Sequence, residues 1–256
     1  MRKTPILPRK ALFPVLLILA AILLSGCGRV LPAGADSPYI TADGYSGADI
    51  LSYFSDIAFG SEYGGYRGTV CKWTTPVKLG LVGNWTEADR ALLEELMETL
   101  RSLEGFPGIS FAEGEEANLL LRFVPQGELT DYFGENAENA RGMSLFFFRL
   151  STGEILKAEA GVASDITLQS ARDSVISEEL LQCLGLASDT YTYPESIFYE
   201  GYTAASRPSP LDWALVRLLY HPKITPGMAH SEALRVAAPL LGITDTMTEN
   251  EETMYG

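Results

Sequence analysis

The order of apolar patterns along the chain constrains its fold more than any other sequence feature. From residue 76 onward, apolar residues recur with a period of two, then of about 3.6, and then of two again, which is typical of strands and helices that cover one another. Strands are predicted over residues 76–83, 117–125, 143–150 and 154–162, and helices over residues 48–58, 86–103, 169–184, 210–220 and 231–241. This order predicts an α+β domain with a mixed, twisted sheet and a helical C-terminal part.

The N-terminus has the composition of an export signal. Four basic residues and no acidic residue lie between Met1 and Lys10, and an apolar run follows as far as Leu24. The run is shorter than the roughly 20 residues that a transmembrane helix needs. It leads into Leu-Ser-Gly-Cys, ending at Cys27, which resembles the bacterial lipobox. The resemblance implies cleavage before Cys27 and lipidation of its thiol, so we expect an extracytoplasmic domain that is lipid-anchored to a bacterial membrane.

The rest of the chain divides around one domain. We predict a signal peptide over residues 1–26, a flexible tether over 27–47, a single globular domain over 48–243 and an acidic, disordered tail over 244–256. Loss of the four basic residues with the signal peptide lowers the formal net charge from −14 to about −18. Such an acidic domain is not expected to bind nucleic acid or to adhere as a whole to anionic lipid headgroups.

Few residues are available for metal or thiol chemistry. Cys71 and Cys183 remain after lipidation of Cys27, and two cysteines far apart in sequence leave a disulfide open. His221 and His230 are the two histidines of the chain, which excludes a histidine-rich metal site. The sequence contains no Cys-x-x-Cys, Walker or Rossmann motif.

The predicted helix over residues 169–184 carries the main candidate for a functional site. Its apolar face is predicted to consist of Ile176, Leu180, Cys183 and Leu184. Glu178 and Gln182 lie together on another face, and Glu179 lies between the two faces. In the simplest interpretation Glu178 and Gln182 are an i,i+4 pair on a solvated face, and Gly185 ends the helix.

A resemblance gives a second interpretation. The stretch Ser177-Glu178-Glu179-Leu180-Leu181-Gln182-Cys183-Leu184-Gly185-Leu186, with Asp189 and residues 196–198 and 211–228 after it, is similar to an uncharacterised bacterial domain-of-unknown-function family, mostly of exported proteins or lipoproteins. The same pattern resembles a degenerate metzincin, a zincin metalloprotease in which His-Glu-x-x-His-x-x-Gly-x-x-His supplies three zinc ligands and a general base. The resemblance implies a zincin-like fold with Glu-Glu-x-x-Gln-x-x-Gly on its central helix.

The residues at the zinc-ligand positions differ from those of metzincins. When the two patterns are aligned on the glycine, Glu178 and Gln182 replace the first two histidines, Glu179 keeps the base position, and Ser188 takes the third-ligand position with Asp189 next to it. Candidate metal ligands are therefore Glu178, Gln182 and Asp189, and the candidate catalytic base is Glu179. Because Gln182 offers only a neutral carbonyl, we expect no cofactor and an inactive, zincin-like binding domain. A divalent metal in a peptidase or other hydrolase is the alternative.

An aromatic loop follows the helix. It contains Tyr191, Tyr193, Phe198, Tyr199 and Tyr202 among prolines and glycines. It is interpreted either as a recognition surface for a peptide or glycan, or as a cover for the core. Asp212 is predicted to cap the next helix. We expect the membrane as a partner through the lipid anchor, together with an envelope protein, peptide or cell-wall component. A structural or assembly lipoprotein is the third hypothesis.

Overall fold

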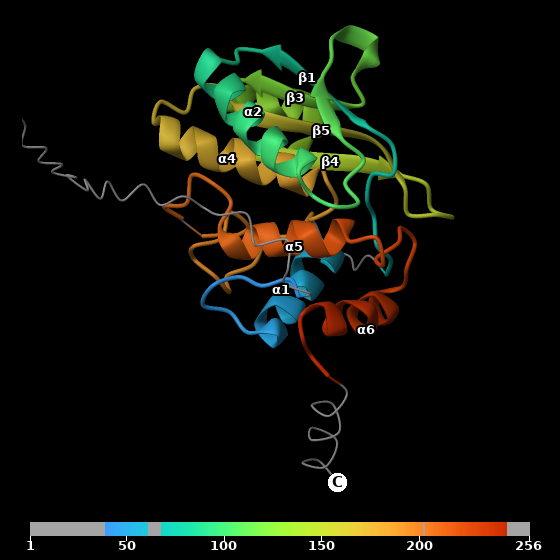
Figure 1. Cartoon of the computed structure of the whole chain (residues 1–256). Coiled ribbons are helices and arrows are strands. Elements are labelled where there is room, and N and C mark those ends of the chain that lie inside the picture. The colour runs from blue at the N-terminus through green and yellow to red at the C-terminus, as the bar shows by residue number, and fades with distance from the viewer. Residues whose placement is uncertain (1–38, 61–67, 202, 245–256) are drawn as a thin grey trace, which may run out of the picture. The chain divides into compact units, whose positions relative to one another are not determined.

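The computed structural model describes residues 39–60, 68–201 and 203–244 (Figure 1). The predicted signal peptide, Cys27 and its lipidation, most of the tether, Tyr202 and nearly all of the acidic tail lie outside these residues. Residues 36–256 form one compact unit that contains the whole described hydrophobic core. A fragment that starts at Asp36 should therefore fold without the preceding residues.

One five-stranded mixed sheet lies at the centre of the fold. Its strands are β1 (Val77–Gly83), β2 (Ile109–Phe111), β3 (Leu119–Val124), β4 (Gly142–Phe148) and β5 (Ile155–Ala163), in the order β2-β1-β3-β5-β4. Four strands are parallel, and β4 pairs antiparallel with β5 at one edge of the described sheet. The predicted mixed sheet is thus confirmed, and β2 is the strand that the sequence analysis missed.

Helices cover both faces of the sheet. They are α1 (Gly47–Phe59), α2 (Glu87–Arg101), α3 (Leu129–Phe133), α4 (Gln169–Gln182), α5 (Pro210–Tyr220) and α6 (His230–Leu240), with 3-10 turns at Gly114–Glu116, Gln126–Glu128 and Glu135–Ala137. In Figure 1, α2 and α4 lie on one face of the sheet, and α1, α5 and α6 lie beyond α4. On the opposite face α3 covers Gly161, where a Cβ atom would lie 2.6 Å from Cδ2 of Leu129. Within the described residues, no helix is long and apolar enough to cross a membrane.

Capping residues set the starts of α2 and α5. The side chain of Thr86 accepts a hydrogen bond from the Asp89 N–H, and the Asp89 carboxylate accepts one from the Thr86 N–H. Ser209 and Asp212 form the same reciprocal pair at the start of α5. Each pair satisfies backbone N–H groups that have no partner within the helix. The prediction that Asp212 is a capping residue is confirmed.

A buried ion pair joins the first turns of α2 and α4. Nε and Nη2 of Arg172 donate to the two carboxylate oxygens of Asp89 at 2.8 and 2.7 Å, and both side chains are almost fully buried. Arg172 also donates to the carbonyls of Ser164 and Asn84, so its guanidinium is well satisfied. Burial alone would raise the pKa of Asp89, but the bonds from Arg172, Thr86 and Gln169 outweigh it and lower that pKa.

The last part of the predicted tether packs against the domain. The Ile40 N–H donates to the Leu240 carbonyl at 2.8 Å, and Nη2 of Arg217 donates to the Thr41 carbonyl at 3.0 Å. Ala42 is buried in the main core. Residues 40–42 therefore pack on the domain, because a few apolar residues among the polar ones suffice to hold this segment.

Candidate functional site

The C-terminal half of α4 lies against the edge strand β4. A Cβ atom at Gly142 would lie 2.1 Å from Oε1 of Glu179 and 2.6 Å from Cγ1 of Val175. Glycine at this position of β4 therefore leaves room for the Glu179 carboxylate beside the strand. Glu179 is only 4% exposed. The residue predicted as a base is thus a buried carboxylate next to the backbone of the edge strand.

Gln182 connects β4 with the segment that follows α4. Its Oε1 accepts a hydrogen bond from Oγ of Ser144 at 2.7 Å, and its Nε2 donates to Oδ1 of Asp189 at 2.8 Å. The side chain is 2% exposed, so the interpretation that Gln182 lies on a solvated helix face is wrong. The physical reason is that the sheet, α2 and the segment after α4 cover this helix on several sides, which the helical period alone does not reveal.

Glu178, at the first ligand position, and Ser188, at the third, lie in different surroundings. Glu178 is half-buried, and its spacing of four residues from Gln182 places both on one side of α4. Ser188 is buried against the end of α1, where a Cβ atom at Gly60 would lie 2.4 Å from its Oγ. Of the two residues considered for the third position, Asp189 is therefore the one whose side chain returns to α4.

Gly185 makes this return of the chain possible. Its φ is +115°, a conformation that residues with a Cβ atom rarely adopt, and a Cβ atom here would lie 2.1 Å from the Cys71 carbonyl oxygen. The last helical residue of α4 is Gln182, and the chain turns at Gly185 toward Asp189. The helix therefore ends three residues before Gly185 and not at it, and Gly185 belongs to the turn that follows.

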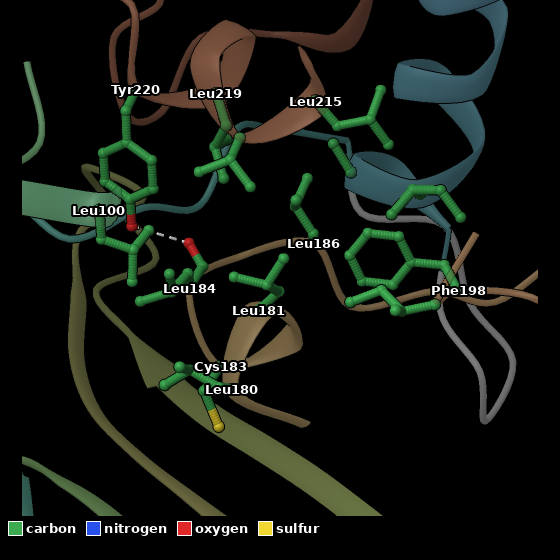
Figure 2. Close-up of a cluster of buried hydrophobic side chains, with 14 of the residues drawn as sticks. Leu100, Leu180, Leu181, Cys183, Leu184, Leu186, Phe198, Leu215, Leu219 and Tyr220 are labelled. Carbon is green, nitrogen blue, oxygen red and sulfur yellow. Dashed lines mark hydrogen bonds between the residues drawn. The ribbon is translucent and has the colours of Figure 1, made fainter. Parts of the chain in front are cut away.

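The two cysteines of the domain are buried and are not joined by a disulfide. Figure 2 shows Cys183 beside Leu180 in a cluster of buried apolar side chains. In the same cluster, Oη of Tyr220 donates to the Leu184 carbonyl at 2.9 Å. Complete burial raises the pKa of the Cys183 thiol well above its ordinary value. A thiol of this kind packs as a small hydrophobe and is a poor nucleophile.

The two histidines make contacts with α1 and with the turn after α5. Nε2 of His230 lies 2.8 Å from Oγ of Ser55, and the His230 ring packs edge-on against Phe59. His221 follows the last residue of α5, and its Nδ1 accepts a hydrogen bond from the Lys223 N–H. Among the residues that the structure describes, no group of three or more His, Cys, Asp or Glu side chains is placed to hold a metal ion.

The aromatic loop has two kinds of side chains. Tyr191 is 66% exposed and lies edge-on to the half-buried Tyr199, so these two rings face solvent at least in part. Phe198 is fully buried in the cluster of Figure 2. Tyr193 packs edge-on against Tyr53 of α1. Each interpretation of the loop therefore fits some of its residues, because Phe198 and Tyr193 hold the loop on the core while Tyr191 and Tyr199 are available for contact.

A buried hydrogen-bond chain fixes the base of this loop. Oη of Tyr53 donates to Oγ of Ser196 at 2.8 Å, and Ser196 donates to Oδ1 of Asp212 at 2.5 Å. Burial raises the pKa of both Tyr53 and Asp212, although hydrogen bonds to Asp212 oppose the change. The chain links α1, the loop and α5, so the aromatic segment is held by more than apolar packing.

Sequence reasoning missed Ser144 and Gly142, which complete the site from the strand side. Both alternate with Met143 in a stretch whose period predicted a strand, but the pattern does not indicate which helix faces them. The signal that was available is the glycine itself, because glycine inside a strand often marks a close approach of another group.

The family of the chain follows from comparison with known proteins. Residues 47–238 match the family described as "Protein of unknown function (DUF2927)", and the chain belongs to this family. The matched range includes the whole sheet, α4 and the aromatic loop. The predicted membership of a domain-of-unknown-function family is thus confirmed. No curated protein matches the chain.

Proposed function

We propose that this chain is a lipid-anchored, extracytoplasmic binding domain whose zincin-like site has lost its catalytic metal and recognises a partner instead. One observation carries the proposal: Asp189, next to the third-ligand position, returns to within 2.8 Å of Gln182, at the second-ligand position. A three-ligand site needs such a return, and here the two side chains bond to each other. The sheet with an antiparallel edge strand beside α4 supports the same proposal.

The residues present do not fit a catalytic zinc. Zinc in catalytic sites takes imidazole, thiolate or carboxylate ligands, whereas Gln182 offers a carbonyl that already accepts from Ser144. Its amide nitrogen, which cannot bind a cation, faces the carboxylate of Asp189. Gln182 thus joins two sides of the site by hydrogen bonds. A metal-dependent hydrolase with Glu178, Gln182 and Asp189 as ligands and Glu179 as base would have to break both of them.

The partner that this arrangement suits is an extended polypeptide. β4 is an edge strand of the described sheet, with β5 as its neighbour on one side. The backbone groups on the other side of an edge strand can pair with a further strand. Tyr191 and Tyr199 in the loop after α4 would add aromatic contacts. The lipid anchor proposed at Cys27 would keep this edge in the envelope, where exported proteins are available.

Panning of a phage-displayed peptide library on the fragment of residues 36–256 tests this proposal. Peptides that bind should slow amide hydrogen exchange in residues 142–148, because they add to the edge of β4. The variant Ser144→Pro, which places a ring on that strand and removes a backbone N–H, should lose these peptides. Ser110→Pro on the other edge strand, β2, is the matched control and should keep them.

Peptides that protect only other segments would contradict the assignment of β4 as the contact. Selection of no peptide at all would favour the structural or assembly lipoprotein over a peptide-binding domain. The folded state of each variant is checked by circular dichroism before its binding is compared.

A further inference from the structure

The hairpin between β4 and β5 exposes a cluster of large apolar side chains. Of the seven large hydrophobic residues that the described part of the chain exposes, three lie here: Leu150 at 89%, Phe147 at 58% and Leu156 at 49%. The hairpin extends beyond the end of the sheet (Figure 1). Single exposed hydrophobic residues are ordinary, but a group on one projecting element is typical of a contact surface.

One side of the turn of this hairpin is fixed to the domain. The Lys72 N–H donates to the Gly153 carbonyl, and the Ile155 N–H donates to the Lys72 carbonyl at 3.0 Å. Gly153 has a φ of +70°, and a Cβ atom there would lie 2.3 Å from the Gly227 backbone nitrogen. The hairpin is therefore bonded to the rest of the domain next to its turn, while Phe147, Leu150 and Leu156 stay exposed.

The charge of the hairpin differs from that of the chain. Between residues 147 and 157 there are two cations, Arg149 and Lys157, and one carboxylate, Glu154, whereas the whole chain has a formal charge of −14. Arg149 forms an ion pair with Glu154. Lys157 is exposed and lies directly opposite Phe147 in the pairing of β4 with β5. The hairpin thus places an ammonium group beside an exposed aromatic ring, with Leu150 beyond both.

We propose that the β4–β5 hairpin docks reversibly on an anionic phospholipid bilayer, with Leu150 and Phe147 at the boundary of headgroups and acyl chains and Lys157 at the phosphates. Aromatic and apolar side chains flanked by a basic one are the composition that binds this boundary. At about 0.1 M salt, charges act over only about 10 Å, so a projecting cation is attracted although the domain is acidic. The inference rests on the proposed lipid anchor only because that anchor would hold the domain near a membrane.

The test uses the fragment of residues 36–256, which lacks Cys27, so failure of the lipid anchor does not affect the result. We expect it to float with vesicles of phosphatidylcholine mixed with phosphatidylglycerol. The variant Phe147→Ser/Leu150→Ser/Leu156→Ser should lower the partition coefficient by at least about tenfold, because it removes apolar surface that the bilayer would bury. Leu168→Ser, at a position 63% exposed before α4, is the matched control and should bind like wild type.

Charge gives an independent measurement. Lys157→Glu should weaken flotation with the mixed vesicles more than with pure phosphatidylcholine. The inference is overturned if the wild-type fragment does not float, or if the triple variant floats as well as wild type while circular dichroism shows both folded. It is equally overturned if the fragment dimerises in solution through this hairpin instead of binding vesicles.

Discussion

Two glycines, Gly142 in β4 and Gly185 after α4, decide how the site is built. Gly142 faces the buried carboxylate of Glu179, and Gly185 faces the backbone of Cys71 in a left-handed conformation. The first makes room for a side chain, and the second lets the chain turn toward Asp189. Both depend on contacts between segments far apart in sequence.

Replacement of Gly142 by alanine should destabilise the protein by about 1–3 kcal/mol, because the new methyl group would overlap Glu179 and Val175. The loss in the free energy of unfolding is measured by urea denaturation. The double variant Gly142→Ala/Glu179→Ala, which lacks the Glu179 carboxylate, should regain part of the lost free energy of unfolding, because the two residues contact each other.

Gly127→Ala is the matched control for that substitution. A Cβ atom at Gly127 would have no neighbour within 4 Å, so this change should leave the stability within about 0.5 kcal/mol of wild type. An equal loss at both glycines would show that the contact between Gly142 and Glu179 does not matter for stability.

At this scale the sequence predicted Glu178, Glu179, Gln182, Gly185 and Asp189 as one group, because a single helix and the turn after it carry them. In the structure Gln182 bonds to Asp189, and Glu179 lies beside Gly142 of β4. Ser144 could not be found, since no local pattern pairs a residue of the hairpin strand with one position of a helix 38 residues later.

Among the secondary-structure elements, α2 and α4 are joined by the buried ion pair of Asp89 and Arg172. Loss of one partner leaves a buried charge, so Asp89→Asn or Arg172→Met should cost about 3–5 kcal/mol of unfolding free energy. Glu98→Ala is the control, because Glu98 is 80% exposed in its ion pair with Arg101 and should contribute little.

The same pair predicts the direction of the acid response. The pKa of Asp89 is lowered in the folded state, so its contribution is present above the unfolded pKa of about 4 and is lost as the pH falls through the folded pKa. The stability gap between wild type and Asp89→Asn should therefore shrink in urea titrations below about pH 4. A gap that stays constant with pH would show that the folded pKa of Asp89 is not lowered.

The long elements were predictable because each shows several turns or alternations of its period. The helix predicted over residues 169–184 corresponds to α4, and the strand predicted over 154–162 corresponds to β5. The three-residue β2 and the five-residue α3 were not predicted, since such short segments contain less than two periods of a pattern. Their positions depend on the sheet and on Gly161, which are long-range features.

At the scale of the whole molecule, two neighbouring surfaces are proposed to bind different partners. The edge of β4 and the aromatic loop would hold an extended partner, and the β4–β5 hairpin would rest on the bilayer to which we propose that Cys27 is anchored. Both use the same antiparallel pair at the edge of the sheet. Binding of a peptide to β4 and docking of the hairpin should therefore influence each other, because Phe147 belongs both to β4 and to the proposed docking surface.

The central claim is that α4 retains the geometry of a zinc site without its ligands. The most direct measurement is the zinc content of residues 36–256, purified without chelator or affinity metal, dialysed against zinc and compared with Glu178→His/Gln182→His. We predict no stoichiometric zinc in wild type and near-stoichiometric zinc in the double variant, because the two imidazoles would join Asp189 as ligands. Addition of Asp189→Asn to the double variant should weaken that binding. Stoichiometric zinc in wild type that Glu178→Ala loses, or none in the double variant, would contradict the claim.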